Sequence, residues 1–150
     1  MKVILQNVLN ASVSINGNIY SSINRGFLLL VGFSSFDNEE IIKKMALKIS
    51  KLRVFEDQNK KTNLSLKDVD GEILSVSQFT LYGSVLEGNR PSFIKALNPK
   101  EASKFYDIFN DELKNLSLKV KTGIFQTDMK VSLVNDGPFT LILDSEELFK

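Results

Sequence analysis

The sequence predicts a single α+β domain with a mostly antiparallel or mixed β-sheet that curls towards a barrel, together with two main helices. The chain has 150 residues, enough for one domain with a substantial core. Its strand-like segments come in runs and do not alternate strictly with helices, and only two segments have helical periodicity. We therefore expect residues 1–150 to form one domain.

The N-terminal third is expected to be mainly β-structure. Val3 to Val8 forms the first strand-like run. Val13 to Tyr20 alternates apolar and polar residues around Asn16-Gly17, a dipeptide that tolerates positive φ at both turn positions. Gly26 to Phe33 is a continuous apolar run of the kind that forms a buried strand. These patterns predict a strand, a hairpin and a buried strand.

Two segments are predicted to be helical. The first runs from about Asn38 to Arg53, with Asp37 and Glu40 resembling a capping pair at its start. The second starts with Asn98 as the cap and Pro99 at its first position. Each carries an apolar stripe at helical spacing: Ile41, Ile42, Met45, Ala46, Ile49 and Leu52 in the first, and Ala102, Phe105, Phe109, Leu113 and Leu116 in the second.

The remaining segments are predicted to be strands and connections. Glu56 to Asn63 is polar and is expected to be a loop, whereas Glu72 to Tyr82 has the pattern of a long strand. Gly83 to Pro99 is predicted to be an irregular connection, and loops of this length in compact domains are often functional. The final expected strands are Ser117 to Thr122, Met129 to Asn135 and Phe139 to Leu143.

The composition removes the commonest catalytic groups. The chain contains no His and no Cys, so a Ser-His-Asp triad and a His- or Cys-ligated zinc are excluded. It has no phosphate-binding P-loop pattern, and we expect neither a metal nor another cofactor. Catalysis has to rest on hydroxyls, amides, carboxylates, backbone N–H groups or the substrate itself. The net charge of +1 does not indicate a partner, although basic residues gather on the first predicted helix and between Arg90 and Lys104.

The sequence gives an expectation about location. No apolar run approaches the length of about 18 residues needed for a membrane span. The N-terminus lacks the apolar core and cleavage site of a signal peptide. We therefore expect a cytoplasmic protein with no membrane partner.

Two short stretches place polar groups within or beside apolar runs: Ser77 to Leu81 and Asn135 to Thr140. If the first is a strand, alternation puts Ser77 and Phe79 on one face and Gln78 and Thr80 on the other. The second fits a turn between two strands around Gly137-Pro138. Taken alone, each stretch is compatible with a purely structural role.

Five collinear segments resemble the D-aminoacyl-tRNA deacylase family. They are Leu52–Asp57, Asn63–Ser65, Val76–Tyr82, Gly88–Phe93 and Val131–Pro138, and the likeness extends from Met1 to about Ser145. The resemblance implies a homodimeric hydrolase that cleaves the ester between a D-amino acid, or glycine, and the 3′-terminal adenosine of tRNA. Such enzymes serve translation quality control.

The resemblance also implies roles for particular residues. It assigns Gly137 and Pro138, joined by a cis bond and supplied by the partner subunit, to a backbone filter that rejects L-amino acids. Thr80 and Gln78 are the candidate catalytic residues. Ser77 and Phe79 line the pocket, and Phe125 and Met129 flank the adenosine and aminoacyl group. Either Thr80 or the 2′-hydroxyl of the tRNA drives the chemistry. The sequence offers no side chain as a base for Thr80.

Three departures from the family pattern leave alternatives open. Asn7 stands where the family usually has Arg, Phe139 where it has Val, and Gln126 where it commonly has Gly. A related deacylase that accepts some L-aminoacyl-tRNAs is one alternative, with its Gly-Pro motif altered through Asn7 and Phe139. A non-catalytic RNA-binding module is another, although the near-neutral charge argues against it.

Overall fold

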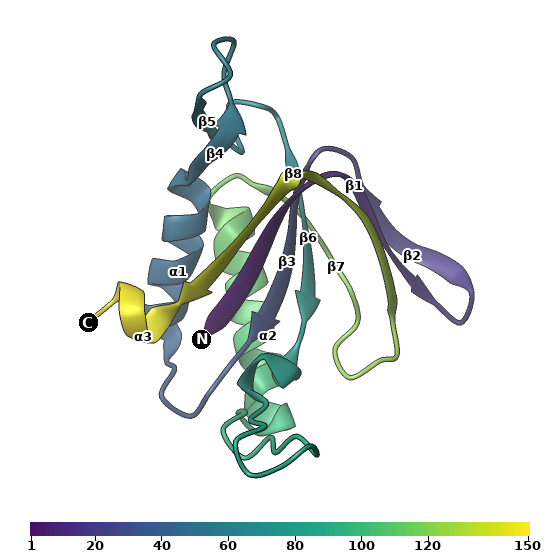
Figure 1. The fold of residues 1–150 in the computed structure, drawn as a ribbon, viewed down its shortest axis with the longest axis vertical. Helices are drawn as coiled ribbons and strands as arrows, with labels where there is room; N and C mark the ends of the chain where they lie inside the picture. The colour runs from purple at the N-terminus through teal and green to yellow at the C-terminus, as the bar shows by residue number, and fades with distance from the viewer.

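The computed structural model, which describes residues 1–150, has a six-stranded mixed sheet with two long helices against one face (Figure 1). The strands are β1 (Lys2–Ile15), β2 (Asn18–Ile23), β3 (Gly26–Gly32), β6 (Glu72–Ser77), β7 (Lys119–Thr122) and β8 (Lys130–Asp144). A separate hairpin is formed by β4 (Arg53–Glu56) and β5 (Thr62–Ser65). The helices are α1 (Glu39–Lys51), α2 (Pro99–Asn115) and the short α3 (Ser145–Leu148), and Phe79–Tyr82 forms a 3₁₀ turn.

Two parallel crossovers place both long helices on the same face of the sheet. Strands β3 and β6 are parallel and are connected through α1, and β6 and β7 are parallel and are connected through α2. Right-handed crossovers that advance in one direction across a sheet put their helices on one side. The two helices accordingly contact each other behind the sheet in Figure 1. None of the helices is long and apolar enough to cross a membrane.

The other part of the sheet is antiparallel and curls strongly. β1 pairs along one edge with β3 and then with β2, while β8 pairs along almost the whole of its other edge. Asn16 and Gly17 have φ values of 51° and 79°, so the predicted Asn-Gly hairpin is confirmed. The mixed sheet is nearly closed into a barrel, which confirms the predicted fold class.

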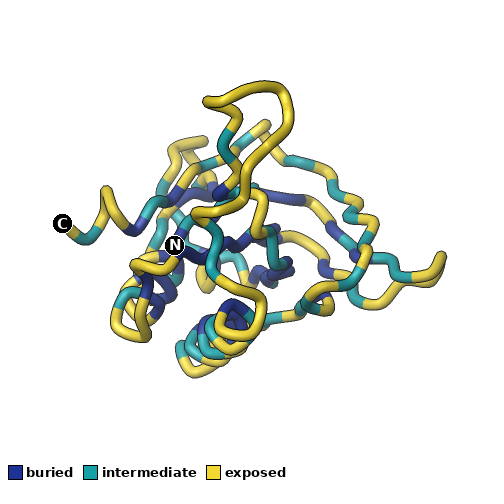
Figure 2. The backbone as a smooth tube through the Cα atoms, turned by 90° about the horizontal axis from the view of Figure 1, so that it is seen from below, coloured by how far each residue is buried: buried dark blue, intermediate teal, exposed yellow.

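The core explains why the Gly26–Phe33 run lacks an apolar–polar alternation. Phe27, Leu29 and Val31 belong to the main core together with the buried faces of both helices. Leu28, on the opposite face, belongs to a second buried cluster inside the curled sheet. Figure 2 shows buried segments in the middle of the molecule and exposed loops around them. A strand that is buried on both faces is apolar throughout, so this prediction is confirmed.

The starts of the two long helices differ in how well they were predicted. Asn98 caps α2 as expected, because its side-chain oxygen accepts a 3.1 Å hydrogen bond from the backbone of Glu101. The predicted Asp37–Glu40 pair at α1 is wrong, since Asn38 is the cap and accepts from the backbone N–H of Ile41 at 3.0 Å. The Asp37 carboxylate instead accepts bonds from Ser34 and from the amino group of Met1.

Three predicted boundaries are wrong. Arg53 belongs to β4 and not to the first helix, so the expected loop from residue 56 begins inside a hairpin. The expected strand to Tyr82 ends at Ser77, because the chain turns into the 3₁₀ turn at Phe79. The alternation predicted for residues 77–80 therefore does not exist. Gly137-Pro138 is not a turn between two strands but lies within the single long strand β8.

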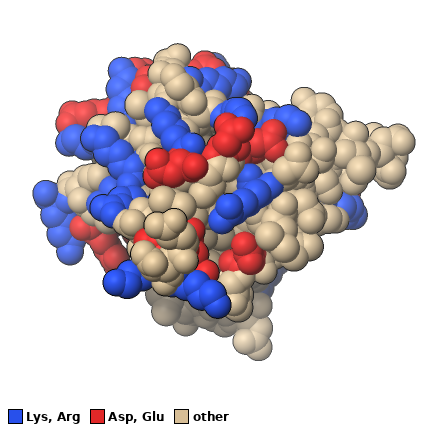
Figure 3. Space-filling view, turned by 90° about the horizontal axis from the view of Figure 1, so that it is seen from above, with Lys and Arg blue, Asp and Glu red and all other residues tan.

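The charged residues form no large patch of one sign on the face shown in Figure 3. Lys and Arg side chains there alternate with Asp and Glu side chains, and an uncharged lobe projects to one side. On α1, Lys44 pairs with Glu40 at 2.7 Å. Arg53 donates a 2.8 Å bond to the backbone carbonyl of Asn63. The basic residues predicted on the first helix thus belong to an ordinary mixed surface.

Candidate active site

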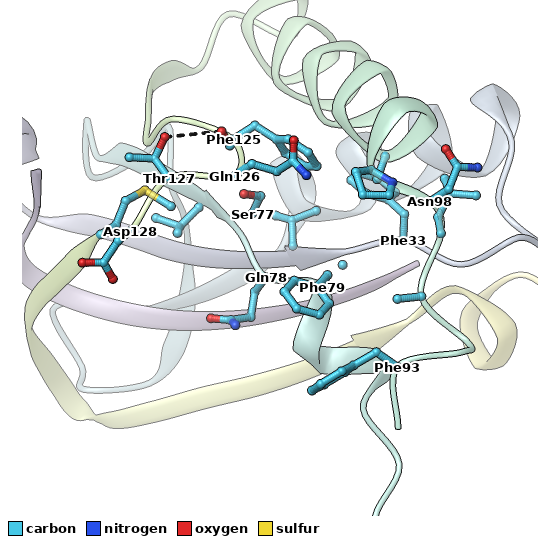
Figure 4. Close-up of a pocket in the computed structure, with 18 of the residues that line it drawn as sticks. Phe33, Ser77, Gln78, Phe79, Phe93, Asn98, Phe125, Gln126, Thr127 and Asp128 are labelled. Atoms are coloured by element: carbon cyan, nitrogen blue, oxygen red, sulfur yellow. Dashed lines mark hydrogen bonds between the residues drawn. The ribbon is translucent and has the colours of Figure 1, made fainter. Parts of the chain in front are cut away.

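A cavity of about 790 Å³ lies beside the carboxyl ends of the parallel strands β3 and β6 and the N-terminus of α2 (Figure 4). Crevices at the carboxyl ends of parallel strands are common ligand sites. Its lining is mostly apolar: Val31, Gly32, Phe33, Val76, Ser77, Gln78, Phe79, Phe93, Ala96, Leu97, Asn98, Pro99, Ala102, Phe125, Gln126, Thr127, Asp128, Met129 and Val131.

One wall of the cavity is the segment where β6 ends. The Gln78 N–H donates a 2.7 Å bond to the Val31 carbonyl, after which the chain enters the 3₁₀ turn. Phe79 leaves 55% of its surface exposed and packs edge-to-face against Phe93, with ring centroids 5.0 Å apart. Thr80 is exposed and does not line the cavity, but its hydroxyl accepts a hydrogen bond from the Gln78 amide. Of the four residues Ser77–Thr80 that form this wall, the first three therefore line the cavity.

The opposite wall is the segment that joins β7 to β8. Its first residue, Gly123, donates a 3.0 Å bond to the Ser75 carbonyl, which ties the segment to β6. A Cβ on Gly123 would lie 2.5 Å from the Met129 sulfur, so a larger residue here would force the Met129 side chain to shift. The Phe125 ring lies 6.1 Å from that of Tyr106 on α2. The structure thus places Phe125 across the cavity from Ser77 and Phe79, as Figure 4 shows, and Met129 lines the same cavity.

The cavity is electrically almost neutral. Asp128 is the only charged residue in its lining, and its carboxylate pairs with the Lys130 ammonium at 2.8 Å. Tyr106 borders the site, and burial raises the pKa of its phenol while its hydroxyl donates a 2.7 Å bond to the Ser75 carbonyl. No cluster of carboxylates is arranged to hold a metal ion. The arrangement suits an uncharged group held by apolar contacts and a few amides and hydroxyls.

Gly137 and Pro138 lie outside this cavity, in a bulge of β8. The β1–β8 register passes from Gln6–Thr140 to Val8–Asn135, so Asn7 stands opposite the whole segment Asp136–Phe139. Gly137 and Pro138 are exposed, the peptide bond between them is cis, and neither residue lines the cavity. The bulge therefore presents these two residues to the outside of the chain.

The bulge is held by amides rather than by an arginine. Asn135 accepts a 2.9 Å bond from the Phe139 N–H and donates a 3.0 Å bond to the Thr140 hydroxyl, which also receives a 3.3 Å bond from Gln6. Asn7 is buried and donates its 2.8 Å bond to the Val54 carbonyl, away from the bulge. The Phe139 side chain packs against the main core of its own chain. Asn7 and Phe139, two of the three departures from the family pattern, are therefore both directed into their own chain.

Sequence reasoning missed the contribution of α2 and its preceding loop. Phe93, Asn98, Pro99 and Ala102 line the cavity, although Asn98 and Pro99 had been interpreted only as a helix start. The length of the connection before α2 was the available signal, since long connections are often functional. Gln126, noted only as a departure, also lines the cavity.

The fold and the cavity define a single-domain α+β protein with a neutral ligand site at the ends of its parallel strands. Residues 4–144 match the family model described as D-Tyr-tRNA(Tyr) deacylase. The chain belongs to this family.

Individual relatives agree with this assignment. The D-aminoacyl-tRNA deacylases of Lactobacillus gasseri and Lactobacillus acidophilus are 54% and 55% identical to it, with 96% of this chain and 99% of each relative covered. Among solved structures, the c-Myc DNA Unwinding Element Binding Protein has a TM-score of 0.90 at 41% identity, covering 96% of this chain and 98% of its own. A structure described as a probable eukaryotic D-amino acid tRNA deacylase has a TM-score of 0.81 at 19% identity, covering 95% and 97%, and it supports the fold. The family is one of enzymes whose curated members are named deacylases.

Proposed function

We propose that this protein hydrolyses the ester between a D-amino acid, or glycine, and the 3′-terminal adenosine of tRNA, as a step of translation quality control in the cytoplasm. The observation that carries the proposal is the convergence of Ser77, Gln78, Phe79, Phe125 and Met129 around one cavity. These residues come from two separate segments, and the family resemblance assigns all five to the site. Their grouping supports one site for the aminoacyl group and the terminal nucleoside.

The chemistry proposed for the cavity needs no protein nucleophile. An aminoacyl ester is already activated, and the ribose carries a 2′-hydroxyl next to it. Phe79 and Thr80 open a 3₁₀ turn, so their backbone N–H groups have no acceptor within that turn and can stabilise a developing oxyanion. The Thr80 hydroxyl accepts from Gln78, and the chain has no histidine to take its proton. In this proposal Gln78, held by its bond to the Thr80 hydroxyl, orients the ester, while the 2′-hydroxyl assists the attack of water on the ester carbonyl.

The rejection of L-amino acids is proposed to need a second copy of the chain. Gly137 and Pro138 are exposed on a projecting bulge and do not line the cavity of their own chain. In a homodimer, the bulge of one copy completes the cavity of the other and blocks an L side chain with backbone atoms. Exposed apolar residues such as Ile94, at 93%, and Leu86, at 87%, provide surface that association can cover. Glycine has no side chain to clash, so such a filter does not reject it.

The experiment compares D-tyrosyl-, L-tyrosyl- and glycyl-tRNA incubated with the wild-type protein and with Thr80→Ala. We expect the wild type to release tyrosine from the D-ester and glycine from its ester, and to leave the L-ester intact. Thr80→Ala retains the D-tyrosyl rate within about fivefold if the 2′-hydroxyl, and not Thr80, assists the attack of water on the ester. Release of L-tyrosine identifies a deacylase of relaxed chirality, and binding without release identifies an RNA-binding module. Either outcome contradicts the proposal.

A further inference from the structure

Gln126 combines an unfavourable backbone conformation with a place in the cavity lining. Five residues other than glycine have a positive φ: Asn16, Lys60, Asp70, Ser117 and Gln126. The first four lie at turns or at the end of a helix, away from the cavity. Gln126, with φ at 57°, is the only one of the five that lines it. This conformation is unfavourable for residues other than glycine, so the Gln126 side chain is kept in the cavity lining at a conformational cost.

The Gln126 side chain has unused hydrogen-bonding capacity. The side chain is exposed, and its amide makes no hydrogen bond within the chain. Its neighbours are fixed, because Phe125 packs near Tyr106 and the Thr127 hydroxyl bonds to the Phe125 carbonyl at 3.4 Å. In Figure 4, Gln126 extends from this segment beside Phe125 at the edge of the cavity. A fixed loop therefore presents a free donor and a free acceptor to any group that binds there.

We propose that the Gln126 amide pairs with the edge of the adenine base of the bound 3′-terminal nucleoside. This inference rests on the proposed function, which supplies the adenosine. A glutamine amide offers one donor and one acceptor side by side, which match the exocyclic amino group and an adjacent ring nitrogen of adenine. The neutral lining beside Phe125 suits a base better than a phosphate. Gln126 is thus a specificity-determining residue, separate from the groups that orient the ester.

The test measures binding of two non-hydrolysable analogues in which D-tyrosine is amide-linked to the 3′ position of a nucleoside. One analogue carries adenosine, and the other carries purine riboside, which lacks the exocyclic amino group. The wild type is expected to bind the purine riboside analogue about fivefold to tenfold more weakly, the effect of one lost hydrogen bond. In Gln126→Met, which has a similar length and no amide, the two analogues are expected to bind within about twofold of each other.

Two glycine variants separate the amide from the backbone conformation. Gln126→Gly and Lys60→Gly both replace a left-handed residue, at φ values of 57° and 58°. Both are expected to raise the melting temperature slightly, because relief of the strained conformation outweighs the added freedom of the unfolded chain. Only Gln126→Gly is expected to lose the preference for adenosine. Lys60→Gly retains it, since Lys60 lies in the β4–β5 hairpin.

The outcomes distinguish this inference from the proposed function. If the wild type hydrolyses D-tyrosyl-tRNA but binds both analogues equally, the adenine assignment fails and the function stands. The assignment also fails if Gln126→Met keeps the full wild-type preference. If the wild type neither hydrolyses D-tyrosyl-tRNA nor binds either analogue, both proposals are overturned.

Discussion

The Ser77–Thr80 wall and the Gly137–Pro138 bulge differ in how their own chain uses them. The wall follows a buried strand, and Ser77, Gln78 and Phe79 line the cavity of the same chain. The bulge interrupts a long strand and presents exposed residues that line no part of that cavity. The resemblance to the deacylase family assigns both to one site. Three of the four wall residues already line the cavity of their own chain, whereas the bulge can contribute to a cavity only in a second chain.

The comparison also shows two ways of holding a functional backbone. The wall is fixed by a backbone bond from Gln78 to Val31 and by the packing of Phe79 on Phe93. The bulge is fixed by the side chain of Asn135, which closes it by binding Phe139 and Thr140. The wall therefore depends on the core of the sheet, whereas the bulge depends on a few local amide bonds.

Pro138→Ala tests the bulge and has the largest expected effect. We expect hydrolysis of L-tyrosyl-tRNA to rise by about tenfold or more, because alanine no longer fixes the backbone of the bulge that is proposed to block the L side chain. The rate with glycyl-tRNA should change much less, since glycine meets no barrier. The measurement is the initial rate of ester loss for each substrate. An unchanged L-to-D ratio with an unchanged D rate would remove Pro138 from the filter.

Phe79→Ala tests the wall. Loss of this ring removes its packing against Phe93 and its proposed apolar contact with the aminoacyl group, so KM for D-tyrosyl-tRNA should rise by about tenfold. The ring is 55% exposed, so the melting temperature should change little. Phe36→Ala is the matched control, because Phe36 is 77% exposed and does not line the cavity. Equal kinetic effects of the two variants would contradict the assignment.

Asn135→Ala tests whether local amide bonds hold the bulge. Loss of the bonds to Phe139 and Thr140 should cost about 1 kcal/mol of stability and lower the melting temperature by about 2–4 °C. Hydrolysis of L-tyrosyl-tRNA should also rise a few-fold, by less than with Pro138→Ala. Asn18→Ala, which removes one 3.4 Å bond at the hairpin tip, is the control. If Asn135→Ala lowers the melting temperature but still rejects L-tyrosyl-tRNA, the bonds that hold the bulge have no role in chiral selection.

The smallest expected effect concerns acid stability away from both regions. Backbone N–H groups of Lys61 and Asn59 lower the pKa of Asp57 below its ordinary value of 3.8. A carboxyl with a lowered pKa in the folded state stabilises the protein above its ordinary pKa, and this contribution is lost as the pH falls through the folded pKa. Thermal melts of wild type and Asp57→Asn should therefore differ slightly at pH 7, and the difference should shrink as the pH falls below 3.8. A constant difference across this range would contradict the account.

The elements that depend on local pattern were predictable from the sequence. The Asn16-Gly17 hairpin, the buried strand from Gly26 and the cap at Asn98 each follow from residues close together in the chain. The end of β6 at Ser77 was not predictable in this way. Ser-Gln-Phe-Thr-Leu-Tyr has good strand propensity, but the chain turns there to pack Phe79 against Phe93, a contact between segments joined by a long loop.

The candidate site was predictable only in part. Motif likeness identified five of the lining residues, but the residues before and within α2 became visible only when the fold brought them to the cavity. The support of the bulge could not be read from the sequence either. Asn7 donates its hydrogen bond to the Val54 carbonyl and not to the bulge. Asn135 holds the bulge instead, through bonds that depend on the β1–β8 register.

The most direct test of the central claim is to combine a defective wall and a defective bulge in one dimer. One chain carries the two wall substitutions Gln78→Ala and Phe79→Ala, and the other carries the bulge substitution Gly137→Val. The two chains are produced together with different tags, and the dimer that carries both tags is purified. If the bulge of one copy serves the cavity of the other, this species has one intact site and about half of the wild-type rate with D-tyrosyl-tRNA. Failure to obtain a two-tag species, or a rate no higher than the mean of the two parent variants, would contradict the account.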